Sequence, residues 1–579
     1  MRRLGLPATA EAASVLGLVA LAGVYLLTVL PALGDDPIAG GDEGWIMSAA
    51  GKLATDGVFG SDLFRGFYGA EQHYYFNLPL DHFVLAGVFK IFGIGLVQAR
   101  LVSVVSGLAL LALTYGLGRR LGGAWVGLGA AALLVLLRLN LAPFSGLTLT
   151  DLGATVRYDL VAVPYGVAAM LILARRLPGA GLTTGALREP QGERRWNVGD
   201  EAPSLSAVVV AGLLCGVGGV TQFIGALFVL PLAAFLLTLA LPRGRRFVLA
   251  GALCVAATVP FLPYGAYAVA NWDDFRGQSR TVEQETDFLS PAYYWDAITN
   301  EPDRYRIGTG LGGLPSTPGE LASKPSARLA LLVLGPLAAA YVLWRGRREP
   351  MHRLVGFALL GVVIELALFE STKRFVYWVV AAPLLCVAIA DLGAFLWAWR
   401  DALTLPSPKG RGFYVVLRAA VVVIALLFAV EGLVVAAKDV RDAGDHRGAY
   451  ASMTNALRDA LPASASAMGD NRLWPAMRDR DFRSLLLLFY DTNPRISKER
   501  TTSIEGSIER SGVDYILLSP LSREILTKLS PADGADFERF IDTQTCREGT
   551  YLGPTYGPID VYRVLKPGGP RCELQASAP

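Results

Sequence analysis

The sequence predicts a mainly α-helical membrane protein, a polytopic transmembrane bundle of about eleven spans followed by a small C-terminal extracytoplasmic α/β domain. Of its 579 residues, 53% are hydrophobic and only 18% are charged, whereas a soluble domain carries about 25% charged residues. The mean hydropathy is +0.42. The apolar residues also gather in runs long enough for a helix to cross the hydrocarbon core, which takes about 20 residues.

The same composition excludes several other classes of protein. The 53 basic and 50 acidic residues leave a net charge of only +3, so the chain lacks the basic excess of a nucleic-acid binder. Five cysteines in 579 residues are too few for a disulfide scaffold. The abundance of apolar residues also argues against a disordered chain.

The predicted spans follow one another along residues 1–437, which we expect to form the transmembrane bundle. The first run is long for a signal peptide and has no clear cleavage site after it, so we interpret it as a retained span. The predicted spans are 12–33, 97–118, 123–143, 158–174, 205–221, 223–241, 247–270, 328–344, 354–370, 375–398 and 413–437.

Arginine and lysine residues in the short loops predict the orientation of the bundle. If the N-terminus is cytoplasmic, the clusters at 119–120, 175–176, 243–246 and 345–348 all fall on the inner side, as the positive-inside rule requires. Counting Leu78–Gly95 as a span would reverse every later loop, so we predict an interfacial helix on the outer surface there. An odd number of spans then places the C-terminus outside. We expect the bundle to lie in a plasma membrane, such as the inner membrane of a bacterium.

The outer side is predicted to carry two long loops, 34–96 and 271–327, and the soluble domain 438–579. In this domain an amphipathic stretch at 446–462 is followed by short apolar strands at 466–470, 512–519 and 559–564, a pattern typical of a small α/β layer. Cys546 and Cys572 lie in this domain and could form a disulfide if the outer compartment is oxidising.

Two acidic sites stand out, because charges near a bilayer are costly. Asp42 and Glu43 follow the first span and could bind a cation or act as a general base. The structural alternative is a helix N-terminus, where acids are favoured by the helix dipole. Arg157 and Asp159 open the fourth span, where an interfacial ion pair is an equally good reading. Because both sites fall on the outer face, they could converge on one cavity.

Further polar residues are weaker candidates. Lys373 and Arg374 could hold a phosphate group, although interfacial snorkelling explains them as well. Arg65, His73 and Tyr74 lie among aromatic residues of the first outer loop, where a substrate role competes with an ordinary interfacial aromatic belt. A final set of acids within or beside spans is expected to be paired structurally, with a proton path as the alternative: Glu365, Asp391 and Glu431. The sequence has no nucleotide-binding loop and no zinc-hydrolase motif.

Several segments in a fixed order resemble a known family. They are Asp42-Glu43 after the first span, the interfacial Pro-Leu segment, Ala99-Arg100-Leu101, Arg157-x-Asp159, Thr221-Gln222 and Lys-Arg-Phe-x-Tyr-x5-Pro at 373–383. Together they resemble the polytopic GT-C glycosyltransferases of the protein O-mannosyltransferase and lipid A aminoarabinose transferase group, over roughly residues 10–400.

The resemblance implies an inverting transfer of a sugar from a polyprenyl-phosphate donor to a lipid, glycan or protein acceptor on the outer face. It implies that Asp42 is the base, that Glu43 supports it, and that Asp159 with Arg157 forms a second polar wall. Two positions depart from the family pattern: Leu78 and Gln222 stand where many relatives have lysine. Arg65, Lys373 and Arg374 are the candidates for supplying the missing positive charge.

The sequence leaves other readings open. A lipid or solute transporter built on a similar bundle is the main alternative, although its charges should be distributed toward the inner face. No cofactor is implied with certainty, since an Asp-Glu pair is compatible with a divalent cation or with none.

Overall fold

The computed structural model describes most of the chain: residues 8–31, 33–139, 147–177, 203–283, 290–304, 325–370, 373, 375–398, 408–494, 496–497, 503–529, 531–553 and 555–566. These residues form two compact units. Unit 1 comprises Met1–Pro31, Leu101–Gly265 and Phe288–Asp442, and unit 2 comprises Ala32–Arg100, Ala266–Asp287 and Ala443–Pro579. Each unit is therefore assembled from three separate stretches of sequence.

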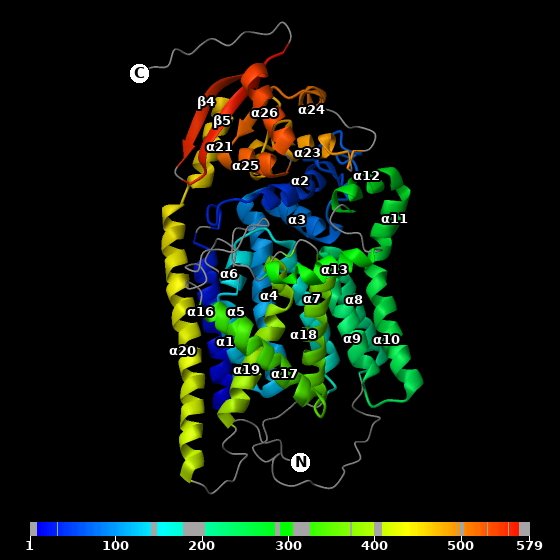
Figure 1. The fold of residues 1–579 in the computed structure, drawn as a ribbon, viewed down its shortest axis with the longest axis vertical. Coiled ribbons are helices and arrows are strands. Elements are labelled where there is room, and N and C mark those ends of the chain that lie inside the picture. Colours follow the sequence, from blue (N-terminus) through cyan, green and yellow to red (C-terminus); the bar gives the residue numbers. More distant parts are fainter. Residues whose placement is uncertain are drawn as a thin grey trace. The chain divides into compact units, whose positions relative to one another are not determined.

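The regular elements among the described residues of unit 1 are all helices (Figure 1). Its α-helices are α1 (Ala8–Val29), α4 (Leu96–Gly122, whose first turn belongs to unit 2), α5 (Ala124–Leu136), α6 (Thr148–Gly153), α7 (Tyr158–Ala174), α8 (Leu205–Thr221), α9 (Val229–Leu237), α10 (Arg243–Thr258), α11 (Leu262–Ala270, whose second half belongs to unit 2), α13 (Pro291–Thr299), α14 (Glu301–Arg304), α16 (Pro325–Arg328), α17 (Gly335–Gly346), α18 (Pro350–Phe369), α19 (Ala382–Ala398) and α20 (Pro408–Asp445, whose last residues belong to unit 2). Short 3-10 helices adjoin several of them, namely η2 (Phe223–Phe228), η3 (Val259–Phe261) and η5 (Phe375–Val380), and the π-helix η4 (Leu329–Leu334) precedes α17.

Each of the predicted spans contains an apolar helix. Six helices of the described residues are long and apolar enough to cross a membrane, and five more apolar helices are shorter. An integral membrane protein is therefore confirmed, whereas the number of about eleven spans and the side of each terminus stay predictions. The last helix, α20, runs unbroken to Asp445, beyond the predicted end of the bundle at residue 437.

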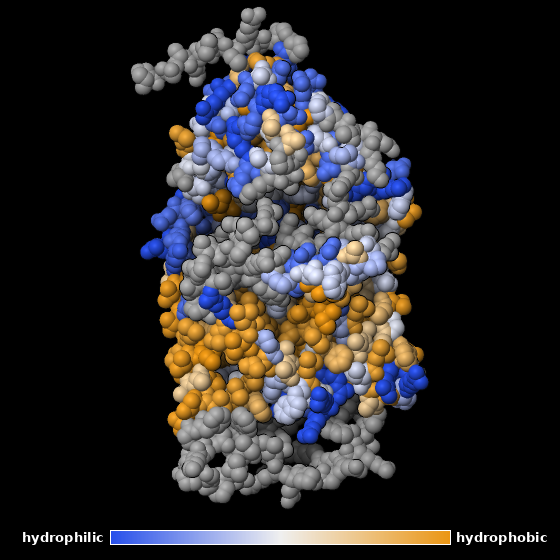
Figure 2. Space-filling model, in the orientation of Figure 1, coloured by the Kyte–Doolittle hydropathy of each residue, from blue (hydrophilic) through white to orange (hydrophobic). Residues whose placement is uncertain are grey.

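The surface of unit 1 has the character of a lipid-facing wall. Figure 2 shows hydrophobic residues covering its face over α17 to α20. On α20, Val415, Val423 and Val430 are each more than half exposed. Exposed valines in such number cost free energy in water and none in hydrocarbon.

Small residues let the helices of unit 1 approach closely. Gly212 and Gly216 lie one turn apart on α8, where α10 packs against it. A Cβ at Gly212 would lie 2.4 Å from the carbonyl oxygen of Leu253, and one at Gly216 would lie 2.3 Å from that of Ala257. This spacing is the small-xxx-small arrangement that membrane helices use to pack.

Unit 2 combines residues 32–100, which the sequence predicts to be outer and which are called the first outer segment, with the C-terminal domain. Its outer segment holds α2 (Gly41–Asp56), η1 (Asp62–Phe64) and α3 (Pro79–Phe92), and α12 (Trp272–Glu283) joins it from the 266–287 stretch. Helix α3 is the helix predicted for Leu78–Gly95. It exposes Phe83, Ile91 and Phe92, which suits an interfacial position, although that position stays a prediction.

The C-terminal domain is the predicted α/β layer. Its helices are α21 (Ala449–Ala460), η7 (Asn471–Leu473), α22 (Trp474–Met477), α23 (Leu486–Thr492), α24 (Ile504–Ser511), α25 (Pro520–Leu529) and α26 (Pro531–Gln544). Its strands are β1 (Ala467–Gly469), β2 (Phe482–Ser484), β3 (Tyr515–Leu518), β4 (Thr545–Gly553) and β5 (Gly557–Val564). They form one sheet of order β2-β1-β3-β5-β4.

This sheet is mixed: β1 is parallel to β2 and β3, whereas β5 is antiparallel to β3 and β4. The three predicted strands correspond to β1, β3 and β5, while β2 and β4 were not predicted. Helices α24 and α26 supply Ile508, Phe537 and Ile541 to the core beside Ile516 of β3. Cys546 of β4 is disulfide-bonded, and Cys572 lies outside the described residues.

Candidate functional site

The predicted Asp42–Glu43 site is the first turn of α2. Gly40 precedes the helix with extended backbone angles, φ −91° and ψ 161°. Glu43 reaches back so that its Oε2 accepts a hydrogen bond of 2.9 Å from the Gly40 amide, which satisfies one of the unpaired donors of a helix start. The helix-terminus interpretation of these acids is therefore correct for Glu43, and it leaves a role for Asp42 open.

Glu43 is buried and forms a two-pronged ion pair with Arg100. Arg100 donates from Nε to Oε1 and from Nη2 to Oε2 of Glu43, at 2.8 Å each. The guanidinium also donates to the carbonyls of Leu33 at 3.0 Å and Pro37 at 2.7 Å. Arg100 is 0% exposed and Glu43 is 3% exposed, and this dense bonding is what a buried pair needs to be tolerated.

Asp42 differs from its neighbour because it is exposed. It precedes the buried Glu43 on the first turn of a well-anchored helix, where the amide ends of the helix favour an anionic side chain. Two adjacent carboxylates thus have separate surroundings. Glu43 holds the local fold, and Asp42 is the one that a substrate could reach.

The second predicted site lies at the start of α7, in unit 1. Asp159 is 0% exposed and forms an ion pair with Nη2 of Arg157, the residue that caps α7. Gln222, between α8 and η2, donates from Nε2 to the other carboxylate oxygen at 3.3 Å. The Arg157 amide donates to the Ser103 hydroxyl of α4 at 3.2 Å. Arg157 and Asp159 of one predicted motif are therefore in contact with each other, and Asp159 is in contact with Gln222 of another.

The aromatic part of the first outer loop is held by α12. His73 Nδ1 lies 2.7 Å from Asp274 Oδ2. The buried Gln278 accepts from the Tyr75 amide at 2.8 Å and donates to the His73 carbonyl at 2.7 Å. Tyr74 is fully buried, and its hydroxyl accepts from Asn77 Nδ2 at 3.0 Å. His73 and Tyr74 are thus part of the packing of the loop.

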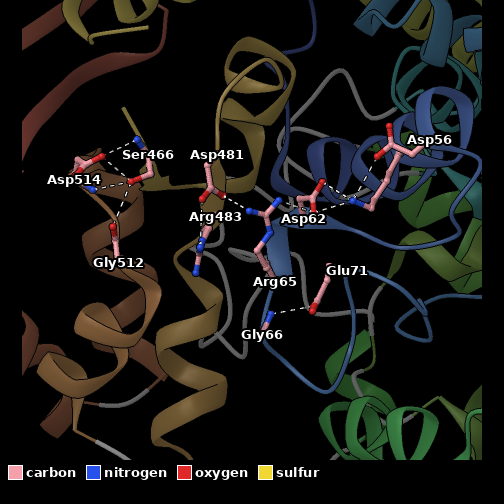
Figure 3. Close-up of polar contacts among 11 residues, drawn as sticks. Asp56, Asp62, Arg65, Gly66, Glu71, Ser466, Asp481, Arg483, Gly512 and Asp514 are labelled. Carbon is pink, nitrogen blue, oxygen red and sulfur yellow. Dashed lines mark hydrogen bonds and ion pairs between the residues drawn. The ribbon is translucent and has the colours of Figure 1, made fainter. Parts of the chain in front are cut away.

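Arg65 lies between two carboxylates of unit 2. Figure 3 shows it reaching Asp62 of η1 on one side and Asp481, just before β2, on the other, at 2.9 and 3.4 Å. Asp62 is also bound by Lys52 at 2.8 Å. Although burial raises the pKa of the Asp62 carboxyl, the hydrogen bonds from Lys52 and Arg65 outweigh it and lower the pKa below the usual range.

Lys373 belongs to a charged network of unit 1 that the sequence did not predict. Its Nζ donates to the Ala367 carbonyl at 2.7 Å and lies 3.1 Å from Glu301. Arg304, 1% exposed, joins Glu301 to Glu370 at 2.8 and 2.7 Å. Lys373 has a left-handed φ of 53°, which a lysine adopts only when its surroundings hold it. Arg374 lies outside the described residues.

The three acids predicted within spans differ in their surroundings. Asp391 lies 2.8 Å from His352 Nε2, and Glu431 lies 3.2 Å from Arg138, so both are paired as expected. Glu365 is buried on α18, without a hydrogen bond or ion pair to any residue that the structure describes. Within that same part of the chain, no group of three or more His, Cys, Asp or Glu residues is arranged to hold a metal ion.

The predicted site residues therefore fall into two groups. Unit 2 carries Asp42, Glu43, Arg65, His73 and Tyr74, and unit 1 carries Arg157, Asp159, Gln222 and Lys373. Sequence reasoning missed the pairing of Arg100 with Glu43. An arginine opening a long apolar run was the available signal, because such a residue needs a buried partner.

Comparisons with known proteins find similar structures, but they find no similar sequence. No family model and no curated protein matches the chain. ArnT from Cupriavidus metallidurans, bound to undecaprenyl phosphate, matches with a TM-score of 0.55 and 16% identity over 96% of this chain and 99% of that chain. The archaeal oligosaccharyltransferase AglB from Archaeoglobus fulgidus, in complex with an inhibitory peptide and a dolichol-phosphate, matches with a TM-score of 0.55 and 12% identity over 94% and 74%.

At these identities the similarity establishes the fold alone. ArnT and AglB are GT-C glycosyltransferases, so the GT-C-like fold predicted from the ordered motifs is confirmed. The match to ArnT extends over the bundle and the C-terminal domain alike, since it covers nearly all of both chains.

Proposed function

We propose that this chain is a membrane glycosyltransferase that moves a sugar from a polyprenyl-phosphate donor to a lipid, glycan or protein acceptor on the extracytoplasmic face. The observation that carries the proposal is the near full-length fold similarity to a protein bound to undecaprenyl phosphate. A second structure with this fold is bound to a dolichol-phosphate and a peptide. Both ligands combine a long apolar chain with a phosphate, as the donor in this proposal does.

The proposed reaction is a single displacement at the anomeric carbon of the sugar. The bond from that carbon to the phosphate oxygen breaks, and its electron pair leaves with the polyprenyl phosphate. A hydroxyl or amine of the acceptor forms the new bond from the opposite face, which inverts the anomeric centre. The proton of the acceptor passes to the Asp42 carboxylate, the general base in this proposal.

Each of the remaining candidates takes a supporting part in the proposal. Glu43 is neutralised by Arg100, so its part is to fix the turn that carries Asp42. A departing phosphate needs cations or hydrogen-bond donors beside it. Arg157, held on Asp159 beside Gln222, offers such donors, and Lys373 and Arg374 are the further candidates.

The test is sugar transfer by purified protein in detergent or vesicles, with labelled polyprenyl-phosphate sugars as donors. Asp42→Asn should lower kcat by about 10²-fold or more, because general bases contribute 10² to 10⁴. Asp56→Asn is the matched control, since Asp56 is an exposed carboxylate at the other end of α2, and it should keep wild-type activity. The site assignment is wrong if Asp42→Asn and Asp159→Asn both transfer sugar at the wild-type rate.

A further inference from the structure

The segment that leads into α2 is fastened to the C-terminal domain at its start. The Asp35 carboxylate accepts hydrogen bonds from the amides of Gly448 and Tyr450, at 2.9 Å each. Asp36 Oδ1 lies 2.7 Å from His446 Nδ1. These residues come together over more than 400 positions of sequence, so they tie the first outer segment to the beginning of the C-terminal domain.

Tyr556 fastens the same segment closer to the helix. It lies in the turn between β4 and β5, the red strands in Figure 1, and its hydroxyl accepts a hydrogen bond of 3.2 Å from the Ala39 amide. Tyr556 is 5% exposed, and burial raises the pKa of its hydroxyl to about 12. The hydroxyl is therefore neutral at physiological pH, and it satisfies an amide only three residues before Asp42.

Helix α2 itself lies against the segment that follows β1. A Cβ at Gly44 would lie 1.7 Å from the carbonyl oxygen of Asn471, and one at Gly41 would lie 3.6 Å from Asp470 Oδ1. Asp470 and Asn471 follow the carboxyl end of β1, and Ser519 follows that of the parallel strand β3. This edge of a parallel sheet is where α/β folds bind ligands. Here α2 packs against the segment at that edge.

Contacts farther from Asp42 complete the junction between the two parts of unit 2. Arg65 bridges Asp62 and Asp481, and the Tyr490 ring lies 5.9 Å from that of Phe76 in a stacked arrangement. A Cβ at Gly51, two turns after Gly44, would lie 2.7 Å from Trp474. The first outer segment and the C-terminal domain are thus one packed body.

We propose that the C-terminal domain positions Asp42 for transfer, with Tyr556 as the positioning residue, so that the domain is an integral part of the transfer site. This inference rests on the proposed function, and it gives the C-terminal domain a part in the transfer. Tyr556 acts through the Ala39 amide and the backbone that leads into α2. It touches neither the reacting atoms nor Asp42 itself.

The first test compares two tyrosines of the same hairpin. Tyr556→Phe should lower kcat by about 10-fold to 100-fold, as small misplacements of a reacting group do, and should change KM for the donor by less than about twofold. Tyr562→Phe is the control, because the Tyr562 hydroxyl accepts from Arg523 within the domain at 2.8 Å. It should keep wild-type kcat, and both variants should remain fully folded at the assay temperature.

Three outcomes of this comparison overturn the proposal. They are wild-type kcat in Tyr556→Phe, an equal loss of kcat in Tyr562→Phe, and a loss of kcat matched by a loss of folded protein. If wild-type protein transfers no sugar from any polyprenyl-phosphate donor, the proposed function fails instead, and the second test still decides the positioning.

The second test does not depend on activity. Hydrogen exchange of the peptide spanning residues 33–46 should be faster in Tyr556→Phe than in wild type, because the Ala39 amide loses its acceptor. Gly44→Ala should speed the same exchange, since its methyl group meets the Asn471 backbone, whereas Gly87→Ala on α3 has open space at its Cβ and should leave it unchanged. Unchanged exchange in Tyr556→Phe overturns the positioning role.

Discussion

The acidic residues in the first turns of α2 and α7 have different surroundings. Both helices begin with a buried carboxylate bound by an arginine: Glu43 by Arg100, and Asp159 by Arg157. At α2 the arginine is itself fully buried and comes from another helix, 57 positions along the sequence. At α7 it is the residue that caps the helix, and its side chain is 15% exposed. Only the α2 turn carries a second acid, the exposed Asp42.

This difference separates a structural carboxylate from an available one. Both oxygens of Glu43 are bound by Arg100 in a buried place. Asp42 is exposed, and it is the carboxylate to which the proposed function assigns the acceptor's proton. In the proposed function the α2 turn therefore supplies both a fixed framework and the general base, whereas the α7 turn supplies an arginine together with its counter-ion.

The largest effect should come from breaking the buried pair at α2. Arg100→Met leaves Glu43 buried without its partner, and such losses cost about 3–5 kcal/mol. Arg157→Met should cost less, about 1–3 kcal/mol, because the Gln222 amide still binds Asp159 and the Arg157 side chain is 15% exposed. Thermal unfolding of the purified variants measures both. A larger loss of stability for Arg157→Met than for Arg100→Met would contradict the stronger structural role given to the buried pair at α2.

A double variant checks the cause of the Arg100 effect. Glu43→Gln in the Arg100→Met background removes the buried negative charge, so it should recover part of the lost stability. If the double variant is less stable than Arg100→Met alone, the arginine acts through its bonds to the Leu33 and Pro37 carbonyls.

Much of the fold could be predicted because its signals are local. An apolar run of about 20 residues is visible without knowledge of its neighbours, and all the predicted runs contain helices. Strands β1, β3 and β5 were predicted from short apolar stretches. Strands β2 and β4 were missed because they are identified by pairing: β2 has three residues, and most of β4 is at least partly exposed.

The site could be predicted only in part, because its contacts cross long stretches of sequence. Asp42 and Asp159 were found as charges at predicted membrane boundaries, where charge is scarce. No sequence signal joins Ala39 to Tyr556, 517 positions later, or Glu301 to Lys373. These pairs depend on the packing of elements whose order along the chain says nothing of their neighbours in space.

We expect the stability of unit 2 to depend on pH through His82. This residue belongs to α3, the helix that packs beside α2. Burial lowers the pKa of His82 to about 4, against about 6.5 in an unfolded chain. Between these values the unfolded chain binds a proton that the folded protein excludes, so stability is highest above pH 6.5 and falls as the pH drops toward 4. The full difference is roughly 3 kcal/mol.

Melting temperatures measured from pH 7.5 to pH 4 test this dependence. His82→Phe keeps a ring beside Phe59 and Tyr74, the rings that His82 contacts, and removes the titration. Its melting temperature should therefore fall less steeply with acid than that of the wild type, although other groups titrate in both proteins. If the melting temperatures of the two proteins fell equally steeply with acid, the lowered pKa of His82 would be contradicted.

The smallest effect is expected at Arg65, whose comparison with Arg100 shows whether pairing or burial sets the cost of losing an arginine. Arg65 also binds two carboxylates, but its side chain is 43% exposed whereas that of Arg100 is fully buried. Exposed ion pairs contribute about 0–1 kcal/mol, and Asp62 keeps its bond to Lys52. Arg65→Ala should thus lose under about 1 kcal/mol of stability in thermal unfolding. A loss as large as that of Arg100→Met would mean that pairing, independently of burial, holds unit 2 together.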